Sequence, residues 1–296
     1  MSGGDAYRGV ISLLSQPNAF TKNAVQLDSF IQQFISLHDD VETGSITGAQ
    51  IDDTRQLFAA MLMQPVPSNI EIGLISMVKI LLRKSSNRND LKKAQMSIII
   101  QKLKQLLSDK NLVATAELCN VILNACYDGC NIQLLLECEG LKQLLRVLTV
   151  CYTRVLVRGV DNSAHFKLVS SVLGAIQGVC YVPLGRQYIR QEIQIFEQLI
   201  NYLSSEDAMI RARAIGAIHN ISVDMVSIQP IYSTPNSIEA IVNLLRDDNH
   251  EVCQAASGTL QNLSRDALVR ESILASKALM YLTDLLCSSE VDCQVC

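Results

Sequence analysis

The feature that most constrains this chain is a short pattern repeated at a fixed spacing of 42 residues. The letters GAIQGVC, GAIHNIS and GTLQNLS occupy residues 174–180, 216–222 and 258–264. A second marker, isoleucine, keeps the same step at Ile189, Ile231 and Ile273. A constant period of this length is typical of repeat proteins, in which each unit contacts mainly its neighbours. The chain is therefore predicted to build one structural unit several times in succession.

Each unit is predicted to be helical. Apolar residues recur every three to four positions along 238–245 and again along 252–263, with a short polar link between the two runs. This period of 3.6 residues indicates two helices whose apolar stripes neither could bury alone, so neighbouring units must cover them. Only 14 glycines and 6 prolines interrupt a chain that is 49% hydrophobic. That composition favours one continuous aliphatic core over two domains joined by a linker.

The unit resembles the armadillo repeat, with its leucine pair, polar turn, paired small residues and G-x-L-x-N-L-S ending. The resemblance implies an all-α fold, an armadillo-type right-handed superhelical solenoid of roughly six to seven units. It covers residues 97–296 well. Residues 1–96 share only the rhythm of helix pairs, as expected of degenerate N-terminal units. Residues 1–296 are thus expected to form a single armadillo-repeat solenoid.

Two irregularities interrupt the repeat. The register predicts an insertion near residues 151–167, with a surface loop around Arg158 to His165. A new unit opens at Leu279, and the chain ends at Cys296, where the last helix of that unit is expected to begin. An incomplete last unit leaves core surface uncovered. Either the chain is a fragment of a longer protein, which we favour, or a partner or second copy closes its end.

No enzyme motif is present in the sequence: there is no phosphate-binding loop, dinucleotide fingerprint, zinc-protease motif or nucleophile elbow. The four histidines lack metal-ligand spacing. Two cysteine pairs, Cys126 with Cys130 and Cys293 with Cys296, have no second matching pair that would indicate zinc or redox chemistry. We therefore expect no catalytic site, no metal and no cofactor.

Charge and cysteine usage limit the location and partners. The net charge of −4 disfavours general nucleic-acid binding, and no apolar run is long enough to cross a membrane. Ten cysteines follow an N-terminus without a signal-peptide pattern, which favours a reducing compartment. The expected location is the cytoplasm or the nucleus.

The candidate binding residues are asparagines on the last helix of successive units, Asn124, Asn220 and Asn262, with Arg213 further along the same face. An amide can donate to and accept from an extended backbone. The resemblance to armadillo proteins such as importin-alpha implies this use in the concave groove. An equally weighted alternative is that these asparagines connect neighbouring units or cap a turn.

One departure separates this chain from the nuclear-import receptors. Those receptors place a tryptophan four residues before the asparagine, whereas this chain has no Trp. The corresponding positions hold Asn120, Gly174, Gly216 and Gly258. The repeat is therefore interpreted as catenin-like rather than importin-alpha-like, with no aromatic slots for a basic peptide.

A second candidate surface is locally basic. Residues 79–110 hold nine lysines and arginines against two aspartates, and the candidates within them are Lys84, Arg88, Lys92 and Lys93. The pattern fits either a solvated outer face or a docking patch for an acidic partner.

The function expected from the sequence is a non-enzymatic protein–protein interaction scaffold that binds an extended or helical segment of a partner protein along its concave face. The alternative is an armadillo-type regulator of an ATPase or GTPase, such as a chaperone cofactor or exchange factor. Neither nucleic-acid binding nor membrane insertion is expected. Association through the incomplete C-terminal repeat is a further expectation.

Overall fold

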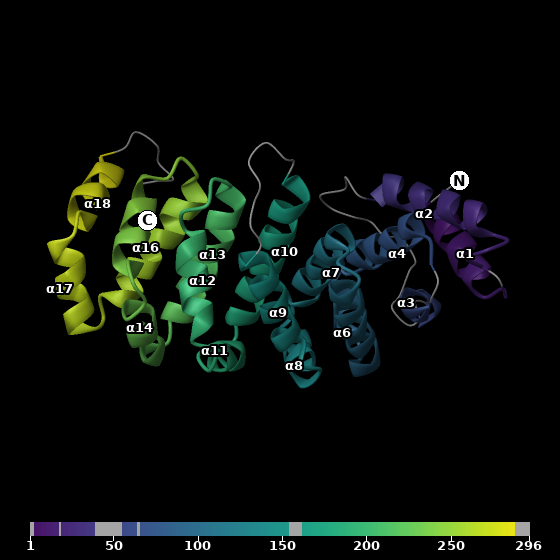
Figure 1. The fold of residues 1–296 in the computed structure, drawn as a ribbon, viewed down its shortest axis with the longest axis horizontal. Coiled ribbons are helices and arrows are strands. Elements are labelled where there is room, and N and C mark those ends of the chain that lie inside the picture. Colours follow the sequence, from purple (N-terminus) through teal and green to yellow (C-terminus); the bar gives the residue numbers. More distant parts are fainter. Residues whose placement is uncertain (1–2, 18, 39–54, 64–65, 154–161, 288–296) are drawn as a thin grey trace. The chain divides into compact units, whose positions relative to one another are not determined.

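The computed structural model describes residues 3–17, 19–38, 55–63, 66–153 and 162–287. These residues form helices joined by short turns and contain no strand (Figure 1). The predicted all-α class is confirmed. The contacts divide the chain into two compact units, of which unit 1 comprises residues 1–147 and 156–175 and unit 2 comprises residues 148–155 and 176–296.

Unit 1 contains the N-terminal helices. Their bounds are α1 Gly3–Leu14, α2 Ala24–His38, α3 Arg55–Leu62, α4 Ser68–Leu81, α5 Ser85–Asn89, α6 Lys93–Ser108, α7 Leu112–Ala125 and α8 Gly129–Glu137. Helices α9 (Gly140–Tyr152) and α10 (Ser163–Cys180) contribute residues to both units. Within unit 1, α4 packs on α2 and on α7 (Figure 1).

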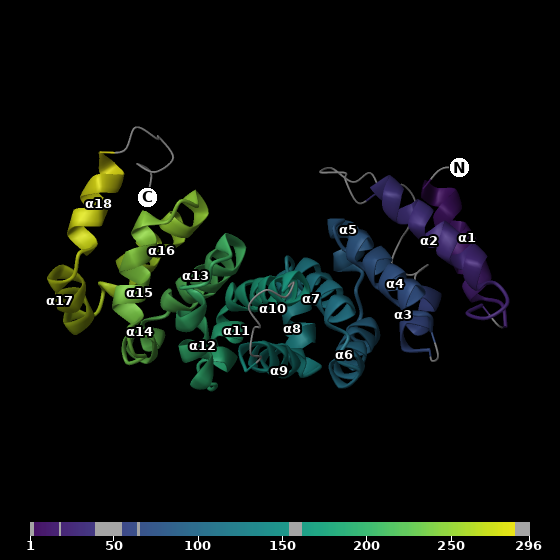
Figure 2. The same cartoon turned by 45° about the horizontal axis from the view of Figure 1, so that its top comes forward.

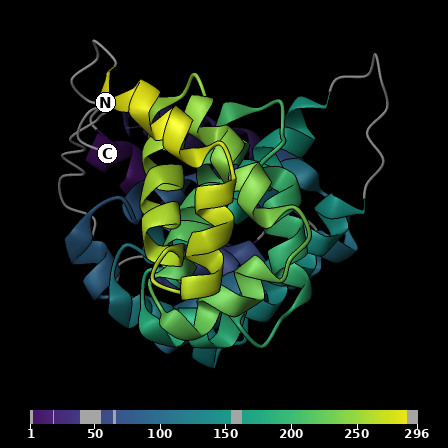
Figure 3. The ribbon, with the colours of Figure 1, turned by 90° about the vertical axis from the view of Figure 1, so that its left-hand side faces the viewer.

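Unit 2 shows the regular order of a short helix, a second helix and a long helix. The bounds are α11 Pro183–Ile189, α12 Gln194–Tyr202, α13 Ala208–Ser222, α14 Met225–Tyr232, α15 Ser237–Asn243, a 3-10 turn Leu244–Arg246, α16 His250–Leu263, α17 Ala267–Ala275 and α18 Ala278–Leu286. The long helices α13 and α16 lie side by side (Figure 2). Figure 3 shows α17 and α18 in front of α16, at the end of unit 2.

The long helices α7, α13 and α16 begin where the sequence supplies a cap. The side chains of Asn111, Asp207 and Asn249 accept the backbone N–H groups of Ala114, Ile210 and Val252. Each bond satisfies a donor that the first turn of a helix leaves unpaired. The starts of these three helices are therefore encoded within a few residues of the sequence.

Aliphatic side chains fill the space between the helices. In unit 2, Ile215 and Ile218 of α13 and Leu263 of α16 are almost completely buried. In unit 1, Leu74 and Val78 of α4 are equally enclosed. These are the apolar positions of the 3.6-residue pattern, so the stripes are covered by neighbouring helices as the sequence predicts.

The irregular regions differ in part from expectation. The loop predicted from Arg158 to His165 extends too far at its C-terminal end. Ser163, Ala164 and His165 form the first turn of α10, and His165 is buried. Residues 158–161 of that loop lie outside the described residues. The expected last helix of the incomplete unit falls on residues 288–296, which are also outside them.

Candidate functional site

The three predicted asparagines occupy equivalent places on the long helices, Asn124 on α7, Asn220 on α13 and Asn262 on α16. Each side chain is half-buried and its Nδ2 donates to the preceding repeat. The acceptors are the carbonyl oxygen of Lys79 at 2.9 Å, the carbonyl oxygen of Gln177 at 3.0 Å and Oγ of Ser222 at 3.0 Å. The amides therefore connect neighbouring repeats.

These bonds also decide what the asparagines can offer a partner. The sequence suggested that each amide presents both a donor and an acceptor. Because each Nδ2 carries two N–H bonds and one of them is used, the second N–H and the carbonyl Oδ1 remain, and no described residue donates to Oδ1 at Asn220 or Asn262. The predicted binding role of Asn124, Asn220 and Asn262 stays a prediction, with one donor of each amide already engaged.

The glycines that stand where import receptors have tryptophan have a packing role. A Cβ atom at Gly216 would collide with the Nε2 of Gln177, and one at Gly258 would lie 2.7 Å from the Cε1 of His219. Gln177 and His219 are the residues directly before the asparagine position of the preceding repeat. Each glycine thus makes room for a polar side chain from the preceding repeat, which fills the space of an aromatic slot.

His219, directly before Asn220 on α13, is one of the four histidines that show no metal-ligand spacing in the sequence. It is half-buried, and its Nδ1 is enclosed without a hydrogen-bond partner. Burial lowers the pKa of His219, because removal from water disfavours the charged imidazolium. The sequence signal that could have revealed this site is the coupling of a glycine in one repeat to a larger polar side chain in the preceding one.

Arg213, the fourth predicted site residue, lies half-buried on α13. Its Nη1 donates to the Oε1 of Gln177 at 3.2 Å. Gln177 thus receives Arg213 on its side chain and Asn220 on its backbone carbonyl. The structure therefore brings Arg213 and Asn220 together around one residue of the preceding repeat.

In unit 1, the equivalent helices carry a charged cluster that the sequence analysis did not identify. The carboxylate of Glu117 on α7 accepts from Lys79 Nζ of α4 at 2.9 Å and from Lys167 Nζ of α10 at 2.6 Å. Burial alone would raise the pKa of Glu117, but the hydrogen bonds from Lys167 and Lys79 outweigh it and hold the pKa below its usual value. One carboxylate thus joins three successive long helices.

The basic stretch is largely neutralised by residues that are distant in sequence. Arg88 pairs with Asp128, and Lys93 pairs with Glu137 at 3.0 Å. Lys102 is completely buried against Glu71. Lys84 and Lys92 are exposed at the starts of α5 and α6. The four candidates therefore do not act as a single block of unpaired positive charge, and their docking role stays a prediction.

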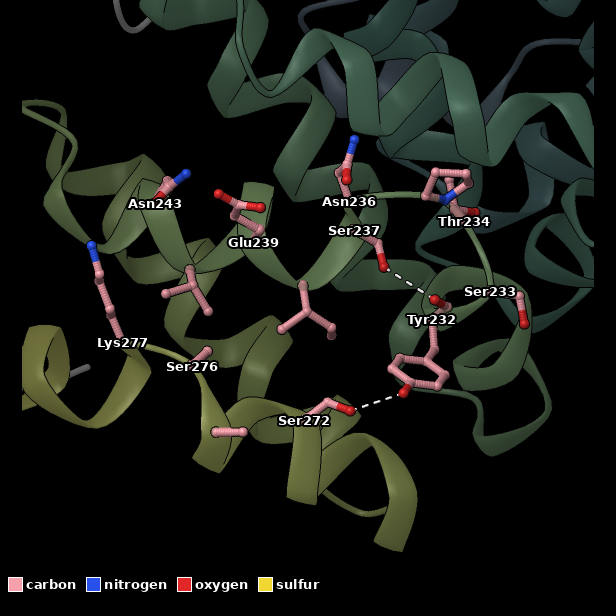
Figure 4. A pocket seen from close by; sticks show the side chains of 14 residues that line it. Tyr232, Ser233, Thr234, Asn236, Ser237, Glu239, Asn243, Ser272, Ser276 and Lys277 are labelled. Atoms are coloured by element: carbon pink, nitrogen blue, oxygen red, sulfur yellow. Dashed lines mark hydrogen bonds between the residues drawn. The ribbon is translucent and has the colours of Figure 1, made fainter.

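A polar depression of about 800 Å³ lies in unit 2 between the α14–α15 turn and the α17–α18 turn (Figure 4). The Tyr232 and Ser272 hydroxyls bond across it at 2.8 Å, and Glu239 and Lys277 stand on different sides (Figure 4). None of the predicted binding residues lines this depression. It is therefore separate from the asparagine positions.

The described residues show no arrangement suited to metal binding or to thiolate chemistry. Among the described residues, no group of three or more His, Cys, Asp or Glu side chains could hold a metal ion. Burial raises the pKa of the Cys126 thiol to about 12, which opposes formation of a reactive thiolate. Cys293 and Cys296 lie outside the described residues. No helix in the described part of the chain has the length and apolar character needed to cross a membrane.

Comparisons with known proteins agree with this architecture. No family profile matches the sequence, and no curated protein matches it. Solved structures do match. An engineered protein aligns with a TM-score of 0.66 at 17% identity, over 82% of this chain and 92% of its own. A protein from a study of computationally designed armadillo repeat proteins for modular peptide recognition gives 0.67 at 16% identity, over 81% and 94%.

A third structure, a designed armadillo repeat protein in complex with the peptide (KR)4, aligns over 97% of this chain and 94% of its own, with a TM-score of 0.54 at 16% identity. At such low identity the likeness concerns the fold alone. The helical repeats and these structural neighbours together show that the chain has the all-α solenoid fold of armadillo repeat proteins.

Proposed function

We propose that this protein is a non-enzymatic interaction scaffold that binds an extended segment of a partner protein on the face formed by the long helices. The observation that carries the proposal is the placement of Asn220 and Asn262 on adjacent helices α13 and α16, each half-buried with its donor fixed by the preceding repeat. Peptide recognition by designed proteins of the same fold supports it.

The chemistry of such a face suits recognition of the backbone. An Oδ1 atom held in place by its own amide's internal bond can accept an N–H from an extended chain without sensing its side chains. Because the amide is already immobilised, binding costs little further side-chain entropy. Repetition of the asparagine in successive repeats then adds one acceptor per repeat.

The same face favours a particular class of segment. Gln177 and His219 occupy the spaces over Gly216 and Gly258, so no aromatic slot is left there for the stem of a lysine or arginine. Arg213 adds a cation on α13. A segment with an acidic or neutral side chain near Arg213 therefore fits this face better than a basic one. We place this function in the cytoplasm or nucleus as part of the same proposal.

The test is selection from a display library of random 10-residue peptides on the full chain. Peptides that bind in the proposed place lose affinity for the Asn220→Ala/Asn262→Ala variant and keep it for a control, Asn201→Ala/Asn243→Ala, which removes two exposed amides from α12 and α15. Circular dichroism and thermal unfolding establish that both variants are folded.

Equal binding of every selected peptide to all three proteins would contradict the proposal. The alternative of an ATPase or GTPase regulator is distinguished by the form of the ligand. Such a regulator would select no short peptide and would bind only a folded, nucleotide-loaded domain.

A further inference from the structure

A second surface of unit 2 also repeats with the 42-residue step. It lies at the turns that lead from each long helix into the next short one. One row consists of Leu184, Val226 and Leu268, and the other consists of Tyr181, Val223 and Arg265. We call these six residues, together with Met225, the corner strip. All of them are exposed, with Tyr181 at 76%, Val226 at 67% and Leu268 at 64%.

The three short helices that carry the corner strip are direct neighbours. Arg190, directly after α11, pairs at 2.7 Å with Asp224, the residue directly before α14. Gln229 of α14 donates to Asp266, which caps α17, at 3.0 Å. The helices α11, α14 and α17 accordingly lie in succession (Figure 1). The exposed apolar side chains therefore form a row rather than scattered points.

The charges beside the row are distributed unevenly. At the α11–α14 end, Asp224 pairs with both Arg186 at 3.0 Å and Arg190, so two guanidinium groups share one carboxylate. At the α17 end, Arg265 is exposed, and its guanidinium contacts the Val223 carbonyl at 3.0 Å and the Met225 sulfur at 3.1 Å. No carboxylate of the described residues pairs with Arg265. Within the corner strip, the cation available to a partner is thus Arg265, at the α17 end, whereas the arginines at the α11–α14 end share Asp224.

We propose that the corner strip is a second docking surface, and that its occupant is an amphipathic helix of a partner protein with apolar residues at seven-residue intervals and an acidic residue at the end over α17. Contiguous exposed apolar surface with tyrosine and methionine is typical of interaction sites. The acidic residue would supply the carboxylate that Arg265 lacks. This surface is distinct from the long-helix face of the proposed function.

The helical form of the occupant follows from spacing. Packed helices lie about 8–10 Å apart, so the anchors on α11, α14 and α17 are separated by about that distance. Seven residues of α-helix advance about 10.5 Å and return to the same face. An extended chain covers the same distance in about three residues, at about 3.3 Å each, and its side chains alternate between two faces. Anchors three residues apart would therefore point in opposite directions. A helix of about 15 residues therefore spans the three repeats with one face.

The experiment is selection of random 18-residue peptides displayed against the full chain, followed by synthesis of the enriched peptides. We expect apolar residues at seven-residue intervals and Asp or Glu near one end. The Leu184→Glu/Val226→Glu variant should weaken binding roughly tenfold or more. The matched control Ile193→Glu/Leu274→Glu adds the same charge at exposed apolar positions outside the corner strip and should bind normally.

A charge exchange tests the orientation. Arg265→Glu should weaken an acidic peptide several-fold, and a peptide with Lys in place of its acidic residue should recover affinity for that variant. Circular dichroism and thermal unfolding identify any variant that fails to fold. The Asn220→Ala/Asn262→Ala variant should bind these peptides normally, which separates this result from failure of the proposed function.

Three outcomes would overturn the inference. The first is a selection in which no peptide depends on the corner strip. The second is a dimer, seen in sedimentation of the chain alone, that the Leu184→Glu/Val226→Glu change dissociates, since the occupant would then be a second copy. The third is binding to phosphatidylserine–phosphatidylcholine vesicles that the same change abolishes, since the surface would then contact lipid.

Discussion

The imidazole of His219 lies over Gly258 of the following repeat, so close that a Cβ atom there would come within 2.7 Å of its Cε1. Gln177 and Gly216 form the same pair one repeat earlier. In both pairs, the glycine of one repeat lies against the polar residue that comes directly before the asparagine position of the preceding repeat. This pairing fixes how adjacent long helices approach in unit 2.

Replacing His219 with glutamine should make the protein less sensitive to mild acid. Burial depresses the pKa of His219 below the value near 6.5 that it has when unfolded. Below that pH the unfolded state binds the proton more readily, so the stability of the native chain falls as the pH is lowered through 6.5 towards the folded pKa.

We expect the difference in unfolding free energy between His219→Gln and the native chain to grow, by at most about 1.4 kcal/mol per pH unit, from pH 7 to pH 5.5. Urea unfolding at several pH values measures it. The other histidines are present in both proteins and cancel in the difference. A difference that stays constant with pH would show that burial of His219 has no such effect.

Two glycine-to-alanine changes should differ in their cost. A Cβ at Gly185 would collide with the backbone carbonyl of Val179, which cannot move without displacing α10. We expect Gly185→Ala to destabilise the protein by about 1–3 kcal/mol, as overpacking does. At Gly216 a Cβ atom would meet only the flexible end of the Gln177 side chain. Alanine favours the helix over glycine by about 1 kcal/mol, which offsets the cost of moving that side chain. Equal unfolding free energies for the two variants would refute this order.

Glu117→Gln should destabilise unit 1, because it leaves the ammonium groups of Lys79 and Lys167 without their carboxylate. The expected loss is about 2 kcal/mol at pH 7. The depressed pKa of Glu117 means that its contribution is present above about pH 4.3 and disappears as the pH falls through the folded pKa. The variant and the native chain should therefore converge in acid. Glu137→Gln, at an exposed ion pair, is the control and should change little.

The cysteines should separate into two classes on alkylation. Burial raises the pKa of both Cys126 and Cys180 to about 12, whereas Cys130 is exposed. Only the thiolate reacts at an appreciable rate. With iodoacetamide at pH 8, mass spectrometry should find Cys130 modified in the native protein and Cys126 and Cys180 modified only after unfolding. Rapid native labelling of Cys126 would indicate that its surroundings open.

Much of the fold could be predicted from local pattern. The helix-pair rhythm of residues 1–96 and the two helices within residues 238–264 correspond to described elements. Periodicity and capping act within a few residues, so the sequence carries them directly. The loop predicted from Arg158 to His165 extended too far, because α10 begins at Ser163.

The candidate site, too, could be predicted from the sequence only in part. The repeat pattern located Asn124, Asn220, Asn262 and Arg213 on the long helices, and it marked Gly216 and Gly258 as unusual. It could not identify the partners of these residues. The basic character of residues 79–110 also suggested a charged patch, while the structure pairs Arg88 and Lys93 with Asp128 and Glu137.

The repeat pattern alone predicts the helical class and the positions that recur on the long helices. The packed chain adds that the Asn220 donor binds Gln177, that His219 fills the space over Gly258 and that Glu117 joins Lys79 to Lys167. The physical reason is distance along the chain. Each contact joins residues of different repeats, and a side chain meets them only after packing of the aliphatic core has set the positions of neighbouring helices.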